Sequence, residues 1–264
     1  MSQGSLIVVG SGIQYSTHIT AQAERFIREA EKVLYVIPGP WAEAWMQSLN
    51  PTAESLIPLY GDNKRRLDTY EQMVAQIMSH VRRGLNVCAV FYGHPGVFVL
   101  PSHEAIKQAR AEGFSAWMHP GVSAEDCLFA DLGIDPAVSG CQSFEATDFL
   151  IRHRRFDPYS HLVIWQVGVI GHLGQTATQE KGGLQLLVEV LQKTYGAMHE
   201  VVIYEAAPHP QYRSRIEPVF LSQLPESRLM SISTLYIPPI GDAPVNQERL
   251  ALLGLTTADL SKTW

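Results

Sequence analysis

NVCAVFYGHPGVF, residues 86–98, is an apolar run that ends in a loop rich in glycine and proline. A short apolar run closed by Gly and Pro is typical of a buried strand that stops at a tight turn. In open α/β sheets, ligands bind beyond the carboxyl ends of strands, and glycines let a ligand approach the backbone closely. We therefore predict a central strand at Asn86–Phe91 and a ligand-binding loop at Tyr92–Phe98. An ordinary strand-to-helix turn is the alternative.

Around this segment, the first half of the chain alternates strand and helix patterns. Continuous apolar runs predict strands that are covered on both faces, and three- and four-residue apolar spacing predicts amphipathic helices. The predicted strands are Leu6–Val9, Val33–Ile37 and Phe114–Met118, and the predicted helices are 20–31, 41–49, 64–83, 102–111 and 124–132, with a loop at Pro58–Asn63. This alternation predicts a largely parallel sheet.

The pattern changes beyond about residue 122. Strands are predicted at Leu162–Gln166, Glu200–Tyr204 and Ser233–Ile237, separated by a helix at Leu184–Tyr195 and by loops that contain proline. We expect an α/β protein of two domains, 1–121 and 122–264. The N-terminal sheet should be largely parallel and the C-terminal sheet mixed, with a cleft between the domains.

Composition excludes several classes of protein. Of the 264 residues, 46% are apolar and 17% are charged, as in a globular chain. A net charge of -6 gives no electrostatic footprint for nucleic acid or an anionic membrane. The N-terminus has no signal segment and no apolar run is long enough to span a membrane, so we expect a cytoplasmic protein. The three widely spaced cysteines fit reduced thiols.

The first strand is followed by Gly10-Ser11-Gly12, which invites a dinucleotide-binding interpretation. Tyr15 stands where the third glycine of that motif should be, and the next strand is followed by Pro38 instead of an acidic residue. These two departures argue against a nicotinamide site.

Other catalytic signatures are incomplete. His103-Glu104 begins a zinc-protease motif, but Lys107 stands where the second histidine ligand would be. We expect no metal. The nucleophile elbow of hydrolases and the phosphate-binding Gly-Lys-Ser/Thr are also missing from the sequence.

Gly10-Ser11-Gly12, Gly93-His94-Pro95-Gly96 and Pro120-Gly121-Val122-Ser123, in this order, resemble the S-adenosylmethionine-dependent tetrapyrrole methylase superfamily over nearly the whole chain. His94 takes the place of the Asp that is frequent in that superfamily. Together with Arg66-Leu67-Asp68-Thr69-Tyr70, the segment 92–98 looks more like the borosin peptide α-N-methyltransferases. The resemblance implies S-adenosylmethionine as cofactor and iterative methylation of backbone amides in a precursor peptide.

Many members of the family that it resembles carry the precursor peptide fused at their C-terminus. This sequence ends with Leu260-Ser261-Lys262-Thr263-Trp264 and shows no apolar peptide tail, which makes it more similar to the split bacterial type. We therefore expect a separate precursor peptide as the partner. From the resemblance alone, we also expect a homodimer.

The matching residues suit the chemistry of amide methylation. An amide nitrogen is a weak nucleophile because its lone pair is delocalised into the carbonyl, so its proton must be removed while the carbonyl oxygen is stabilised. Tyr70 can act as the base if a neighbouring cation lowers its pKa. Arg66 lies one turn earlier on the same helix face, and it can also donate hydrogen bonds to the developing oxyanion. Tyr60 and Tyr92 match the other family tyrosines, and they can position the amide or share its proton.

Each of these four residues also has an ordinary structural interpretation. Arg66 can be a solvated helix charge, and Tyr70 a core aromatic. Tyr60 can be a plain loop residue, and Tyr92 can close the end of its strand. For the cofactor, the resemblance implies contacts from Gly93, His94, Val97, Phe98, Ser123, Ala124, Gln166, Val167, Ser233 and Thr234.

Two other functions stay open at this point. One is a methyltransferase that acts on a tetrapyrrole or another small molecule, and the other is a non-catalytic module that binds the cofactor. The sequence does not identify the core peptide, the number and order of methylations, or the final product.

Overall fold

The computed structural model describes residues 4–61, 64–172 and 181–260, and it divides into two compact units. The first unit comprises the described residues up to Asp131 together with His172 and Ala206–Ser214, and the second comprises the rest. The sequence-based boundary after residue 121 precedes α5 (Ala124–Leu132), most of which belongs to the first unit. None of the described helices is long and apolar enough to cross a membrane.

The first unit is built on a sheet whose described strands all run parallel, in the order β3-β2-β4-β1-β5. Strand β4 lies at its centre, which confirms the strand predicted at Asn86–Phe91. Apolar runs buried on both faces explain why these segments form central strands. The bounds are β1 Ser5–Gly10, β2 Lys32–Val36, β3 Glu54–Ser55, β4 Asn86–Phe91 and β5 Ser115–Met118.

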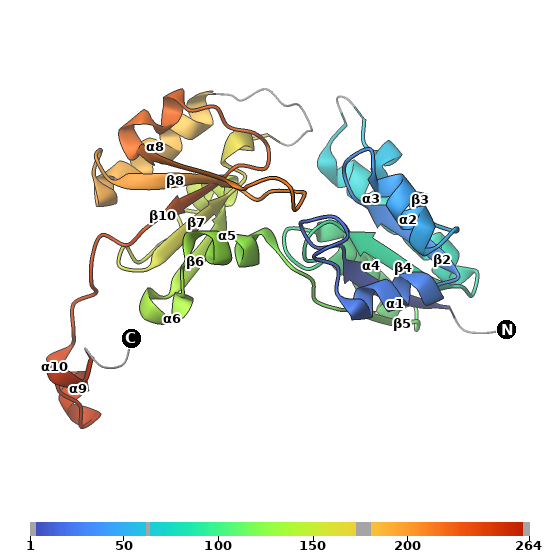
Figure 1. Cartoon of the computed structure of the whole chain (residues 1–264), viewed down its shortest axis with the longest axis horizontal. Helices are drawn as coiled ribbons and strands as arrows, with labels where there is room; N and C mark the ends of the chain where they lie inside the picture. Colours follow the sequence, from blue (N-terminus) through green and yellow to red (C-terminus); the bar gives the residue numbers. More distant parts are fainter. Residues whose placement is uncertain (1–3, 62–63, 173–180, 261–264) are drawn as a thin grey trace. The chain divides into compact units, whose positions relative to one another are not determined.

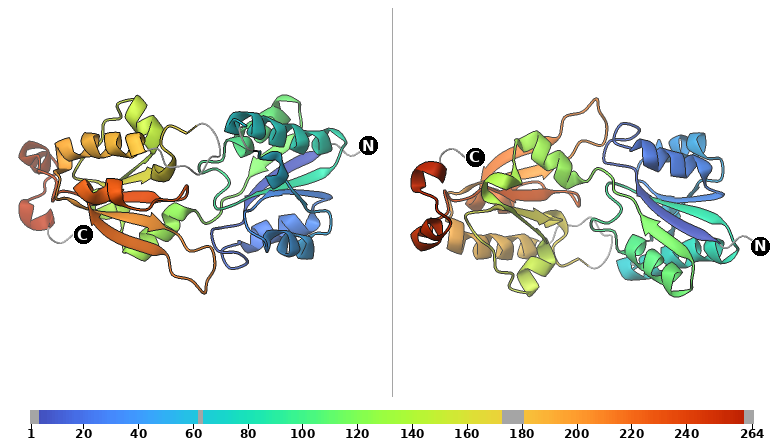
Figure 2. Two further views of the ribbon diagram at one scale, coloured as in Figure 1. Left: turned by 90° about the horizontal axis from the view of Figure 1, so that it is seen from above. Right: turned by 90° about the horizontal axis from the view of Figure 1, so that it is seen from below.

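Helices cover both faces of this sheet (Figures 1 and 2). In β4, Val87 and Ala89 pack toward α3 (Arg66–Arg82) and α4 (Leu100–Ala111). Cys88 and Val90 pack toward α1 (Ala21–Glu29) and α2 (Ala42–Leu49). Because successive side chains of a strand point to opposite faces, this alternation sorts the apolar residues into two cores.

The residue expected to cap the first helix does so in the structure. Thr20 caps α1, where its hydroxyl oxygen accepts a hydrogen bond from the Ala23 amide at 3.0 Å. Part of the loop predicted at Pro58–Asn63 forms the end of η1 (Ile57–Leu59), while residues 62 and 63 lie outside the described residues, as do 261–264.

The second unit contains a mixed sheet in the order β6-β7-β10-β8-β9, as predicted. Only β6 and β7 pair in parallel among its described neighbours. The strand bounds are β6 Cys141–Glu145, β7 His161–Trp165, β8 Glu200–Glu205, β9 Arg215–Phe220 and β10 Thr234–Ile237. The remaining elements are α6 Pro136–Ser139, α7 Ala146–Ile151, η2 Val167–Val169, α8 Lys181–Tyr195, η3 Leu221–Glu226, α9 Gln247–Leu252 and α10 Thr257–Leu260.

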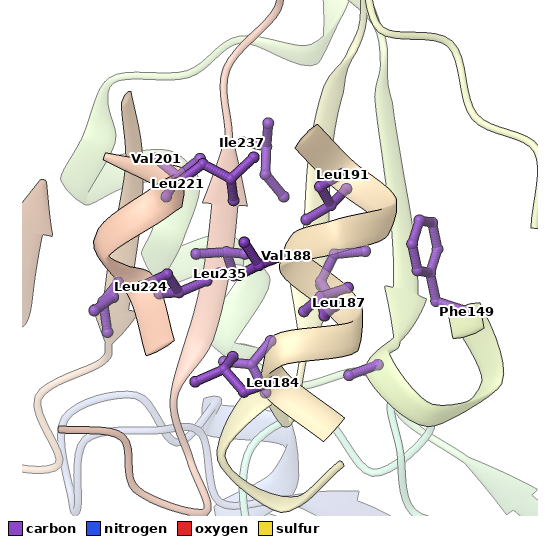
Figure 3. Packing of buried hydrophobic residues seen from close by; sticks show 14 of the residues in the cluster. Phe149, Leu184, Leu187, Val188, Leu191, Val201, Leu221, Leu224, Leu235 and Ile237 are labelled. Atoms are coloured by element: carbon purple, nitrogen blue, oxygen red, sulfur yellow. The ribbon is translucent and has the colours of Figure 1, made fainter. Parts of the chain in front are cut away.

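One apolar stripe of α8 supplies much of the core of the second unit. Figure 3 shows Leu184, Leu187 and Leu191 on this stripe, close to the side chains of β10 and η3. All three leucines are almost completely buried. Their spacing of three and four residues explains the helix that the sequence predicts here.

Candidate functional site

Three loops meet at the carboxyl edge of the parallel sheet. The amide of Gly12 donates a hydrogen bond to the carbonyl of Gly93 at 3.2 Å, and the Gly93 amide donates to the Gly12 carbonyl at 3.0 Å. A Cβ on Gly10 would lie 2.1 Å from the Gly93 oxygen, and a Cβ on Gly121 would lie 3.1 Å from it. Only glycine permits such close backbone packing. The three glycine motifs of the sequence therefore form one cluster, which we call the glycine cradle (Gly10, Gly12, Gly93 and Gly121).

The loop that follows β4 has a fixed conformation. Its backbone turns through positive φ at Gly93 (74°) and again at Phe98 (55°), where the side chain is half exposed. The His94 ring folds back on the loop, and its Nδ1 accepts a hydrogen bond from the Gly96 amide at 2.9 Å. The Ser102 hydroxyl donates to the Pro95 carbonyl at 2.5 Å. The predicted cofactor loop is thus held by its own side chains and by the start of α4.

Ser123 and Ala124 lie beside the glycine cradle, at the start of α5. The buried Ser123 hydroxyl accepts from the Asp126 amide at 3.1 Å, and Oδ2 of Asp126 accepts from both the Ser123 amide and the Ser123 hydroxyl at 2.6 Å. This reciprocal pair resembles a capping box, in which two side chains satisfy the first amides of a helix. Ser123 therefore has a structural role whatever it contributes to a ligand.

The four candidate residues of the second unit also lie together. Gln166 adopts a left-handed backbone conformation (φ 61°), and the next amide, that of Val167, donates to the Ser233 carbonyl at 3.2 Å. Thr234 is buried at the start of β10. A position that joins the ends of two strands in one corner suits a ligand site.

A buried carboxylate supports this corner, and sequence reasoning missed it. Oε1 of Glu205, whose side chain is 7% exposed, accepts hydrogen bonds from the Ser233 hydroxyl at 2.5 Å and from Arg215 at 2.8 Å. Glu205 ends β8 and Arg215 begins β9, where the two residues pair directly. Hydrophobic periodicity carries no signal for such a pairing across a long loop.

Tyr60, Arg66 and Tyr70 form one cluster in the first unit. Arg66 begins α3, Tyr70 lies one turn later, and Tyr60 follows η1. The pKa of Tyr60 is raised to about 12, mainly by burial and also by the nearby Tyr70, while the Arg66 charge opposes this rise. The hydrogen bond between the two tyrosines also raises the pKa of Tyr60. A bond that raises the pKa of an acid is one in which the acid donates, so the Tyr60 hydroxyl donates to Tyr70.

Tyr92 does not join this cluster. Its ring packs against Tyr15 with the ring centroids 6.3 Å apart, on the face covered by α1 and α2. Phe91 faces the opposite core because neighbouring positions alternate at a strand end. Burial raises the pKa of Tyr92 well above its usual value, which favours the neutral phenol. The catalytic role expected for Tyr92 stays a prediction.

The candidate cofactor residues fit an adenosine-bearing sulfonium in chemical type. The Gly93 carbonyl, which accepts from Gly12, retains a second acceptor lone pair, and the half-exposed ring of Phe98 offers an apolar surface. A purine uses both kinds of contact, stacking and hydrogen bonding. In the part of the chain that the structure describes, no group of three or more His, Cys, Asp or Glu side chains is arranged to hold a metal ion.

Comparison with known proteins decides the family. The model of the family described as tetrapyrrole (corrin/porphyrin) methylases matches residues 5–223. The chain belongs to this family. Uroporphyrin-III-C-methyltransferase of Thermus thermophilus has the same fold, with a TM-score of 0.64 and 18% identity over 90% of this chain and 93% of that structure. The expected fold, α/β with a parallel and a mixed sheet, is thereby confirmed.

The similar curated proteins are methyltransferases that carry a peptide precursor. The gymnopeptide precursor protein of Gymnopus fusipes is 44% identical over 97% of this chain and 62% of its own length. A type I borosin protein of Coprinopsis marcescibilis is 43% identical over 97% of this chain and 68% of its own length. A type III borosin protein of Anomoporia bombycina is 44% identical, and the chain spans 30% of it. These relatives and the family confirm the expected enzyme class, methyltransferase, and the resemblance to borosin proteins.

The expectation of a separate precursor peptide is wrong by the same comparisons. The relatives are named as methyltransferase and precursor in one chain. The expectation rested on the last residues of the sequence, yet the chain spans at most about three fifths of the length of the first relatives. Its final residue therefore says nothing about where a precursor lies. The expected homodimer stays untested.

Proposed function

We propose that this chain methylates backbone amide nitrogens of a ribosomally made peptide, with S-adenosylmethionine as the methyl donor. The cluster of Tyr60, Arg66 and Tyr70 carries this proposal, because it supplies a base, a donor to that base and a fixed cation next to one another. The borosin relatives support a peptide as the substrate class.

Tyr70 is the base in this proposal. The Tyr60 hydroxyl donates its hydrogen bond to Tyr70 and keeps its proton to about pH 12, so it stabilises negative charge on the Tyr70 oxygen. Arg66 adds a permanent positive charge beside the pair. Of the two phenols, Tyr70 is therefore the one that we assign to accept the amide proton.

The amide is activated as its proton moves to the Tyr70 oxygen. The nitrogen electron pair forms the new bond to carbon, and negative charge that develops on the carbonyl oxygen is stabilised by the guanidinium of Arg66. When bound, the cofactor supplies an electrophilic methyl carbon, and the electron pair of its carbon–sulfur bond stays on sulfur. Proton, methyl group and electrons are then all accounted for without an oxidant or a metal.

The candidate cofactor residues of this proposal form two groups, each within its own unit. The first is the loop at Gly93, His94, Val97 and Phe98 with Ser123 and Ala124 beside it. The second comprises Gln166, Val167, Ser233 and Thr234 in the second unit. Hydrogen bonds within each group fix its backbone before a ligand arrives, which reduces the entropy lost on binding.

The test uses the chain with an apolar peptide fused to its C-terminus, since the relatives carry their precursor in the same chain. We expect successive mass gains of one methylene each in the presence of S-adenosylmethionine, and fragmentation should locate them on backbone nitrogens. Tyr70→Phe should slow the gains by about a hundredfold or more, because it removes a general base. Tyr159→Phe, in the second unit, is the matched control.

Two outcomes would contradict the proposal. One is a Tyr70→Phe protein that methylates at the rate of the unmodified chain. The other is an unchanged peptide mass although cofactor binding is shown by calorimetry, which would favour a tetrapyrrole or another small molecule as the acceptor.

A further inference from the structure

A hollow of about 470 Å³ in the first unit is lined mainly by aromatic rings. Its walls come from three parts of the sequence: the loop after β1, helix α2 with the residue before it, and the segment Ala206–Ser214. The volume suits a few amino-acid residues or a small organic group. We call it the aromatic hollow, and its main lining residues are Tyr15, Trp41, Trp45, His209, Pro210 and Tyr212.

The rings that line the hollow pack against one another, and two of them at the rim are largely exposed to solvent. Tyr15 meets His209 edge-on with the ring centroids 4.9 Å apart, and it packs against Trp45 at 6.3 Å. The Tyr15 hydroxyl donates to the carbonyl of Pro38, so its polar end is already engaged. Trp41 and Tyr212 are each 67% exposed at the rim. A well-packed wall with a large exposed aromatic rim is typical of a binding surface.

The hollow is continuous with a candidate site residue. Tyr15 lies between the hollow and Tyr92, and its ring contacts the Tyr92 ring with the centroids 6.3 Å apart. Tyr92 follows β4 and precedes the glycine cradle. The hollow therefore adjoins the strand end that leads into the glycine cradle.

The uncharged, aromatic lining of the hollow indicates which class of ligand it can bind. The described residues that line the hollow include no Asp, Glu, Lys or Arg, and the uncharged polar side chains of Ser16 and Gln211 lie among the rings. An amide N–H pressed against ring faces would lose its hydrogen bond to water without a replacement. A methylated amide has no N–H, and its methyl group gains contact with the rings. An uncharged apolar peptide with methylated amides fits this lining better than the same peptide without methyl groups.

We propose that the aromatic hollow binds the part of the peptide that has already been methylated. This inference rests on the proposed function, because it takes the product of that reaction as the ligand. It gives the enzyme a site that retains its peptide between successive rounds, since each new methyl group improves the fit. The ligand class is an apolar peptide with tertiary backbone amides.

The test observes the two tryptophans of the hollow directly. The chain has five tryptophans, which can be replaced by 5-fluorotryptophan and assigned in ¹⁹F spectra by single Trp→Phe changes. The probe is an acetylated apolar tetrapeptide amide with N-methylated backbone, and its unmethylated twin is the comparison. We expect the Trp41 and Trp45 signals to move while those of Trp117 and Trp165 stay. The methylated probe should bind at least about tenfold more tightly, because its twin buries unpaired donors.

Variants at the rim complete the test. Tyr212→Ala should weaken the methylated probe about tenfold, whereas Trp117→Phe, on β5, should leave its affinity unchanged. The proposal would be overturned if the two peptides bound with equal affinity or if the Trp41 and Trp45 signals did not move. It would also be overturned if tetramethylammonium, a cation that aromatic rings can bind, bound more tightly than the methylated peptide. No methyl transfer is needed in this experiment. A failure here is therefore distinct from a failure of the methylation assay.

Discussion

Replacing Gly10 by Ala tests whether close backbone packing in the glycine cradle stabilises the fold and positions the cofactor loop. The added Cβ would lie 2.1 Å from the Gly93 carbonyl oxygen and 2.9 Å from Cδ of Pro95. A carbon and an oxygen normally approach to about 3.3 Å even in close contacts, so the two loops must separate by roughly 1 Å. Neither can move freely, because Gly12 and Gly93 exchange two backbone hydrogen bonds.

The expected loss of stability follows from these contacts. Forcing an extra group into a packed interior costs about 1–3 kcal/mol. Weakening the two backbone hydrogen bonds adds about 1 kcal/mol for each bond. We expect the free energy of unfolding of Gly10→Ala to fall by about 3–5 kcal/mol, measured by urea unfolding with circular dichroism. Gly182→Ala in α8 is the control. Nothing lies within 4 Å of its Cβ, and it should gain up to about 1 kcal/mol.

A second measurement connects the cradle with the ligand. Where Gly10→Ala is still folded, its affinity for S-adenosylmethionine in calorimetry should fall at least about tenfold, because the Gly93–Phe98 loop is displaced. A stability change below about 1 kcal/mol together with unchanged affinity would refute the reasoning.

Two further predictions concern a buried carboxylate and a buried phenol. Glu205→Gln should lower the free energy of unfolding by about 1.5–3 kcal/mol, because it removes a charge-assisted hydrogen bond to Arg215. Glu217→Gln, at the exposed partner of the same arginine, should cost less than about 1 kcal/mol in the same urea assay. The pKa of Tyr60 is about 12 in the fold and about 10 in an unfolded chain, so its contribution to stability is present below pH 10 and is lost as pH rises toward 12. Urea unfolding at several alkaline pH values should show a smaller decline for Tyr60→Phe, and an identical decline would contradict this pKa.

Local patterns predicted the elements that position the site. Continuous apolar runs located the central strands, and the four-residue offset of Arg66 and Tyr70 correctly placed both beside one another on α3. Gly-Pro loops marked the strand ends that meet in the glycine cradle. These features follow from residues that are close in the sequence, where helix and strand periodicity act directly.

Features that depend on distant residues were not predictable in the same way. Strand β9 was missed because Pro218 interrupts its pattern, which an edge strand tolerates since one side needs no hydrogen-bonded neighbour. Tyr92 was grouped with Tyr70 by family likeness, but strand alternation turned its ring to the opposite core. The aromatic hollow and the Glu205–Arg215 pair need a chain reversal across Ala206–Ser214 that leaves no periodic trace.

The division of the chain into two units has a consequence during synthesis on the ribosome. Ala206–Ser214 lies between β8 and β9 of the second unit, yet it belongs to the first. The first unit is therefore unfinished when its own sheet has been made, since Tyr15 gains its contact with His209 only after residue 209 has emerged. An N-terminal fragment that stops at Asp131 would lack that aromatic cover and expose rings that the whole chain protects. The nascent protein thus completes its N-terminal half only after most of its C-terminal half has been translated.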